Sequence, residues 1–289
     1  MLEGQFCVIK PKLTPTDMDT AFTLTRSHIA QVNWKAVGCF YVLACGLSYG
    51  LHFLPNLNQG ILPVHDIFTY GMGPLLAALI TRYAFPNGRR TITILGSLPL
   101  KTILYVLTPI ALSVLVGVHN RAGQDGHLYG LLLGISGLLY GFGEEMGWRG
   151  WLQDALQPLS TFWRVVLIGL MHAGWHLTFL PDLSVVSSGQ ANGLIVVGIL
   201  ILMAWGMGAL VDTTKSVLVV ACAHELMNIA VHPVVLAVTL LVWIWLIRTW
   251  KKPVNIRLGR AVFALTGVVH GINESISHGP ERTDARRRH

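Results

Sequence analysis

Apolar runs of membrane-spanning length recur along this chain from Trp34 to Trp250, and only short polar breaks separate them. A helix needs about 20 predominantly apolar residues to cross a bilayer, and only helices and closed barrels satisfy every backbone polar group in hydrocarbon. Charged residues make up 12% of the sequence, against roughly 25% in an ordinary soluble domain. The pattern therefore predicts an all-α, polytopic integral membrane protein.

The runs resolve into eight candidate transmembrane helices. They cover residues 34–54, 67–85, 101–119, 128–148, 164–180, 192–211, 216–231 and 233–250. Only His232-Pro233 separates the last two, whose combined length is too great for one crossing, so we expect a tight hairpin. One transmembrane domain is predicted over 34–250, between a cytoplasmic or interfacial N-terminal segment (1–33) and a basic cytoplasmic tail (251–289).

Lys and Arg are concentrated in alternate connections between these segments. The other connections are nearly free of cations, Arg121 being the exception. Short cytoplasmic loops are enriched in Lys and Arg, so both termini are expected in the cytoplasm. Topology also accounts for the formal net charge of +7, and we expect the lipid bilayer as a partner and no nucleic acid. No eukaryotic sorting signal was found, which favours a prokaryotic plasma membrane.

Tryptophans and glycines near the ends and along the faces of the segments carry structural predictions. Five tryptophans lie close to expected membrane boundaries, where indole rings are commonly anchored; they are Trp148, Trp151, Trp243, Trp245 and Trp250. The small residues of GLLLGISG at 130–137 predict close helix packing.

Few ionisable side chains fall inside the expected spans, and such residues are functional candidates because burying them in a bilayer is costly. They are Glu144, Glu145, Arg149, His172, His176, His224 and Glu225, with Asn228 as a polar neighbour. Counted from the nearest cytoplasmic cations at about 1.5 Å per residue, three segments place these groups at overlapping depths. We therefore expect three helices to converge on one polar cavity.

A carboxylate that faces imidazoles and an amide is suited to hydrolysis. The carboxylate, with a neighbouring His, removes a proton from water, and a second His with an Asn donates hydrogen bonds to the oxyanion. The same donors suit a divalent metal such as zinc, held by Glu144, His176 and His224, which acidifies its bound water. A proton or ion transporter would also place His and Glu at mid-depth. A non-catalytic scaffold or immunity factor is a further alternative.

At these positions the sequence resembles the CPBP family of intramembrane proteases, which includes type II CAAX prenyl proteases and bacteriocin-processing or self-immunity proteins. GEEMGWRGWL at 143–152 resembles the EExxxR motif of the family, HAGWHL at 172–177 its second motif, and HELMN at 224–228 its HxxxN motif. Together with GMGPLLAALITR at 71–82, the resemblance covers a protease core at about residues 67–231.

The resemblance implies an intramembrane endopeptidase that acts on a membrane-associated or C-terminally prenylated protein or peptide. It implies that Glu144 activates water with the help of His176. It also implies that His224 and Asn228 form the oxyanion site. The family is described both as glutamate-dependent and as metal-dependent, so the expected cofactor is either none or a divalent metal such as zinc.

Three further residues are expected to support this chemistry. Glu145 and Arg149 lie four residues apart on one helical face, where an ion pair is predicted. His172 stands where the family usually has an aromatic residue, so it is an alternative to His176 as the working histidine. The order Trp175-His176-Leu177 fits the family pattern better and favours His176.

Overall fold

The computed structural model describes residues 26–54 and 71–250, apart from 87, 89, 120–122, 124, 180–192 and 229–231. The expected tail and most of the N-terminal segment lie outside the described residues. The regular structure of the described part consists of helices, with one isolated bridge between Thr93 and Ser216 and no strand. The all-α prediction is confirmed.

A helix occupies each of the eight predicted segments. These helices are α3 (Trp34–His52), α5 (Met72–Ala84), α6 (Pro99–Val116), α7 (Gly126–Gly147), α9 (Thr161–Phe179), α11 (Gly193–Thr214), α12 (Val217–Asn228) and α13 (Pro233–Arg248). The shorter elements are α2 (Arg26–Gln31), the π-helical turn η2 (Trp148–Leu152) and α8 (Gln153–Ala155). Within the described part, α3, α6 and α11 are long and apolar enough to cross a membrane. These helices support an integral membrane protein, while the eight crossings and their direction stay predictions.

Capping residues explain where several of these helices begin. The side chain of Asn33 accepts a hydrogen bond from the backbone N–H of Ala36 at the start of α3. The Asp125 carboxylate accepts from the first turn of α7. Both α6 and α13 begin with proline, whose missing N–H costs nothing in a first turn. Local sequence therefore sets these boundaries close to the predicted ones.

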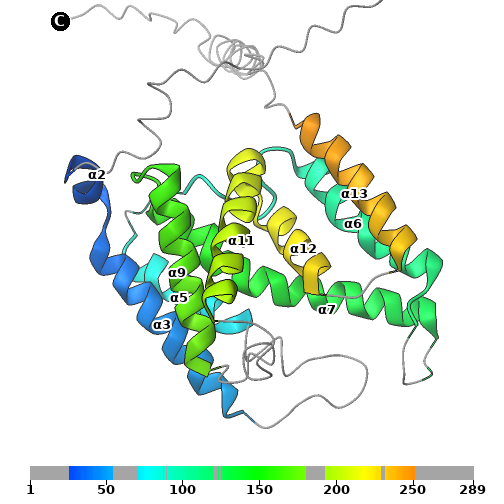
Figure 1. Cartoon of the computed structure of the whole chain (residues 1–289), viewed down its shortest axis with the longest axis horizontal. Coiled ribbons are helices and arrows are strands. Elements are labelled where there is room, and N and C mark those ends of the chain that lie inside the picture. The colour runs from blue at the N-terminus through cyan, green and yellow to red at the C-terminus, as the bar shows by residue number, and fades with distance from the viewer. Residues whose placement is uncertain are drawn as a thin grey trace, which may run out of the picture. The chain divides into compact units, whose positions relative to one another are not determined.

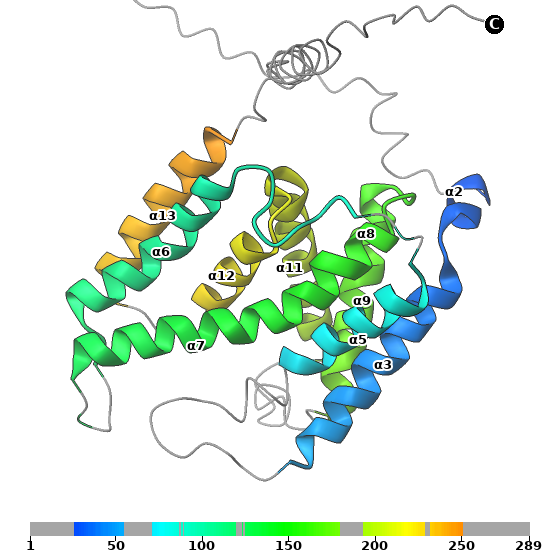
Figure 2. The same cartoon turned by 180° about the vertical axis from the view of Figure 1, so that it is seen from behind.

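Helix α7 is the central element. It contacts α5, α6 and α12, while α3 contacts α5 and α9, α11 contacts α9 and α12, and α13 contacts α6. Figure 1 and Figure 2 show α7 running from the α6–α13 pair at its N-terminal end to the α3, α5 and α9 group at its C-terminal end. Its C-terminal turns, which carry the two glutamates, are therefore surrounded by other helices.

Glycines let α7 approach its neighbours backbone to backbone. A Cβ atom on Gly143 would lie 2.5 Å from the carbonyl oxygen of Gly71, and one on Gly130 would lie 2.5 Å from that of Ser113 in α6. No side chain fits at such distances. The close packing predicted for 130–137 is confirmed, and a second close approach, to α5, lies beside the glutamates.

The prediction of a tryptophan belt is wrong for four of the five residues, because their rings pack inside the protein. The buried ones are Trp148, Trp151, Trp243 and Trp250, whereas Trp245 is 60% exposed. Trp151 stacks on Phe40, and Trp243 stacks on Tyr105 and donates its indole N–H to the Tyr105 carbonyl oxygen at 2.8 Å. Position near the end of a span did not distinguish a protein-facing ring from a lipid-facing one.

The connection between α5 and α6 is folded onto the start of α12. The N–H of Thr93 donates to the Lys215 carbonyl oxygen at 2.9 Å, and the N–H of Val217 donates to the Thr93 carbonyl oxygen at 3.0 Å. The Asp154 carboxylate in α8 accepts hydrogen bonds from Thr91 and from the N–H of Ile92. This connection thus joins α8 to the start of the helix that carries His224.

Candidate active site

Glu144 and Glu145 lie near the C-terminal end of α7, which closes at Gly147, and both are fully buried. Consecutive residues of a helix point about 100° apart, so the two carboxylates meet different neighbours. Glu144 faces α9, and Glu145 faces η2 and α12. The site therefore consists of two adjoining clusters that share one turn of backbone.

The first cluster forms around Glu145. Arg149 in η2 donates from Nη1 to Glu145 Oε1 at 3.0 Å, which is the predicted ion pair, and both side chains are buried. His224 in α12 places Nδ1 at 2.8 Å from the same oxygen. Because Nδ1 faces a carboxylate, it carries the proton of that hydrogen bond, and Nε2 is the ring nitrogen left for another partner. Glu145 therefore fixes the orientation of the His224 ring.

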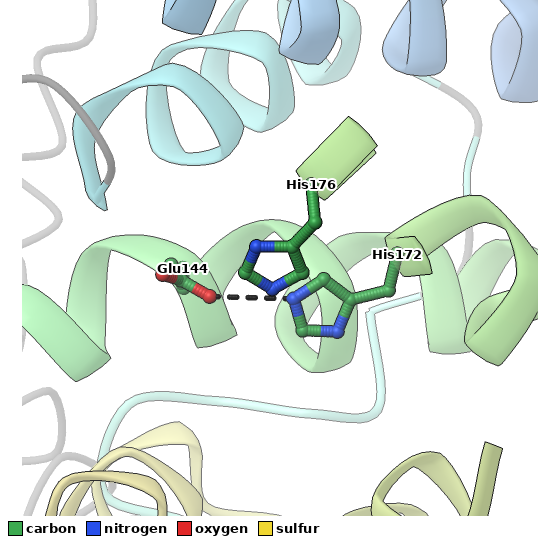
Figure 3. Close-up of side chains that lie close together, drawn as sticks. All are labelled: Glu144, His172 and His176. Carbon is green, nitrogen blue, oxygen red and sulfur yellow. Dashed lines mark ion pairs between the residues drawn. The ribbon is translucent and has the colours of Figure 1, made fainter. Parts of the chain in front are cut away.

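The second cluster forms around Glu144. His172 Nε2 lies 3.4 Å from Glu144 Oε2. One ligand atom from each of Glu144, His172 and His176 lies within 4.8 Å of the others. Figure 3 shows both imidazoles reaching from α9 toward the carboxylate of α7. Both candidate histidines thus belong to the cluster, and His172 is the one that contacts the Glu144 carboxylate at 3.4 Å.

Aromatic rings hold these imidazoles in place. The His172 ring stacks on Trp148 on one side and on His176 on the other, with ring centroids 4.8 Å apart in each case. Trp175 packs against His176 and donates its indole N–H to Ser48 Oγ of α3 at 2.9 Å. Trp148 and Trp175 were not among the site residues predicted from the sequence. Their spacing was the available signal, since Trp148 lies one turn after Glu144 and Trp175 precedes His176.

The donors of the second cluster fit a zinc ion in type, because two imidazoles and one carboxylate form a known catalytic zinc set. Donor atoms around tetrahedral zinc lie roughly 3.3 Å apart, so the 4.8 Å cluster would have to contract by small side-chain rotations. The expected ligand set of Glu144, His176 and His224 differs from it by one member. His172 lies in the cluster, whereas His224 bonds to Glu145.

Two further polar residues belong to α12, and the structure describes the side chain of one of them. Asn228 is the last residue of the helix, and its side chain is outside the described part of the structure. Glu225 is buried on another face of α12, where its carboxyl group lies against Gly137 of α7. Its neighbour His224 is thus the α12 residue that the structure joins to the glutamate pair.

One protein-family model matches this region: the type II CAAX prenyl endopeptidase Rce1-like family matches residues 127–230. The matched segment runs from the first turn of α7 past the end of α12 and contains the residues of both clusters. No curated protein matched the chain. Residues 127–230 are therefore similar to the Rce1-like type II CAAX prenyl endopeptidases, and the resemblance predicted from the three motifs is confirmed for this segment.

Proposed function

We propose that this protein is a membrane endopeptidase in which Glu144 activates the attacking water. The observation that carries the proposal is the different bonding of the two buried glutamates. Oε1 of Glu145 is engaged by Arg149 and His224. Both oxygens of Glu144 accept no hydrogen bond from the protein groups that the structure describes. Glu144 therefore has lone pairs available to take a proton from water.

The proposed reaction begins with a water molecule held between Glu144 and the imidazoles of α9. As the water oxygen attacks the scissile carbonyl carbon, its proton passes to Glu144 and the carbonyl electron pair moves to oxygen. When the C–N bond breaks, the proton moves from Glu144 to the leaving amine nitrogen. His172 orients the water and stabilises the intermediate in which Glu144 holds the proton. The adjoining His176 is the alternative for this role.

His224 and Asn228 are proposed to bind the oxyanion. The bond from Nδ1 to Glu145 leaves Nε2 of His224 for another partner; with its second proton, as an imidazolium balanced by the Glu145 carboxylate, the ring donates from Nε2, and a fixed donor in a buried site stabilises developing charge strongly. Glu145 and Arg149 act as positioning residues, because they hold that ring without touching the reacting atoms.

A metal-dependent version is the alternative, and it rests on the donor set of Glu144, His172 and His176. A zinc ion bound there would lower the pKa of a coordinated water to about 7. The family match by itself does not support this version.

The proposed substrate is a protein or peptide with a prenylated C-terminus, a class that the matched family description names. The proposed setting is eight crossings with both termini in the cytoplasm of a prokaryotic cell. The transmembrane domain of 34–250 then lies between the N-terminal segment 1–33 and the tail 251–289.

The test is to incubate the purified protein with prenylated and matching unprenylated peptides, with and without a chelator. Glu144→Gln should lower kcat by roughly 10²–10⁴, the usual contribution of a general base. The matched control is Glu225→Gln, which neutralises another buried glutamate outside both clusters and should keep at least half of the activity. His172→Gln and His176→Gln, compared in the same assay, identify the working histidine.

Each outcome of this test has a distinct meaning. Cleavage that survives Glu144→Gln would overturn the assignment of the base. Loss of cleavage with chelator and its return with zinc would replace the metal-free mechanism by the metal-dependent one. Coupled ion flux in liposomes, without peptide cleavage, would favour a transporter.

A further inference from the structure

A cavity of about 520 Å³ lies outside both glutamate clusters. It is an open cavity lined by the end of α5, the connection between α5 and α6, the end of α7 with η2, and the start of α12. The lining residues that matter here are Arg82, Arg90, Ile94, Leu95, Met146 and Val217. Neither a glutamate nor a histidine of the candidate active site lines it. The cavity is therefore suited to a ligand other than the peptide segment that is cleaved.

Two arginines at this cavity have no anionic partner among the described residues. Arg149, Arg164 and Lys215 each form an ion pair, whereas Arg82 and Arg90 form none. The carboxylate of Asp154 in α8 accepts hydrogen bonds from Thr91 and Ile92 and forms no ion pair with either arginine in the described part of the structure. The cavity thus combines two guanidinium groups that form no ion pair with the described residues.

The remaining lining named above is apolar. Ile94 and Leu95 are 49% and 40% exposed, although they belong to a connection that is hydrogen-bonded to the start of α12. Met146 and Val217 form the inner wall. An anion alone would gain nothing from this wall, whereas a molecule with an anionic head and an apolar chain would contact both parts.

The cavity lies at the cation-rich ends of the helices. Arg82 is in the last turn of α5, and the connection that follows it meets the backbone of Lys215 at the start of α12. Basic pockets between transmembrane helices at this border bind anionic lipid head groups. The planar guanidinium group of Arg matches phosphate through two parallel hydrogen bonds.

We propose that this cavity binds one anionic phospholipid from the surrounding bilayer. The phosphate lies between Arg82 and Arg90, and an acyl chain lies against Ile94 and Leu95. The lipid then contacts α5, the connection between α5 and α6, and the start of α12. The proposal goes beyond the proposed function, because it requires no peptide substrate and no cleavage.

The experiment titrates the detergent-solubilised full chain with phosphatidylglycerol and with phosphatidylcholine of the same acyl chains, and follows bound lipid by native mass spectrometry. Each cation near the head group contributes about 1 kcal/mol, or roughly fivefold. The wild type should therefore bind phosphatidylglycerol at least about tenfold more tightly. The double variant Arg82→Gln/Arg90→Gln should lose this preference. The matched control Arg248→Gln, which removes an exposed arginine at the end of α13, should keep it.

Several results would overturn the proposal. Equal binding of the two lipids by the wild type does so without any variant, so the test does not depend on how well the double variant folds. If a double variant that is folded by its size-exclusion profile keeps the preference, the two arginines do not bind the head group. If glycerol phosphate displaces the lipid completely at equal concentration, the apolar wall does not contribute to binding. Displacement by a peptide with a free C-terminal carboxylate, but not by its amide, assigns the cavity to substrate.

Discussion

Replacing Arg149 by Met tests whether the Glu145 ion pair holds the site together. The substitution leaves the Glu145 carboxylate fully buried without its partner at 3.0 Å, and breaking a buried pair from one side costs about 3–5 kcal/mol. Two terms reduce this cost. His224 still bonds to the carboxylate at 2.8 Å, and Arg149 Nε and Nη2 form no hydrogen bond in the described structure, so their desolvation penalty disappears. We therefore expect a loss at the lower end, about 3 kcal/mol.

The measurement is the free energy of unfolding in mixed micelles of mild detergent and dodecyl sulfate, followed by circular dichroism. The double variant Glu145→Gln/Arg149→Met removes both charges and keeps an oxygen that accepts from His224. Neutral replacement of a buried pair is often tolerated, so the double variant should recover at least half of the loss. A single variant within about 1 kcal/mol of wild type, below the range for a buried pair, would refute this reasoning. A double variant no more stable than the single one would also refute it.

Three further predictions use the same measurement. Gly143→Ala should cost about 1–3 kcal/mol, because a Cβ there would press on the backbone before α5. The control Gly46→Ala, where a Cβ would meet nothing within 4 Å, should be neutral or stabilising. Equal effects of the two substitutions would contradict the close approach. Trp175→Phe should cost about 1 kcal/mol through loss of the hydrogen bond to Ser48, and an unchanged stability would show that this bond contributes nothing. Asp212 forms partly exposed ion pairs with Arg164 and Lys215, so Asp212→Asn should lower the free energy of unfolding by less than about 1 kcal/mol. A larger loss would show that these ion pairs stabilise the fold more than exposed pairs do.

The sequence was a good guide to the helices because their determinants are local. Apolar length predicted 34–54 and 128–148, and the structure has Trp34–His52 and Gly126–Gly147. The Glu145–Arg149 pair also follows from a spacing of four residues within one helical stretch. No information about neighbouring helices was needed for either prediction.

Local sequence signals did not predict which side chains of different helices contact each other. Which imidazole meets which carboxylate depends on how α9 and α12 are rotated against α7. The family pattern favoured His176, yet His172 is the residue 3.4 Å from Glu144, because it is held between Trp148 and His176. The bond between His224 and Glu145 joins residues 79 positions apart, and no periodicity in the sequence predicts it.

The π-helical turn η2 marks a place where the length of this chain can vary. Its closing hydrogen bond runs from the Gln153 N–H to the Trp148 carbonyl oxygen, five residues back, so the turn holds one residue more than an α-helical turn. Loss of one residue here converts the turn into an α-helical turn and leaves the following side chains in phase, so Gln153 keeps the Gly208 carbonyl oxygen to which it donates at 3.0 Å. The same loss in the middle of α7 would rotate all the following side chains by about 100°. A frame-preserving loss of one codon is therefore better tolerated in η2 than in the regular helix before it.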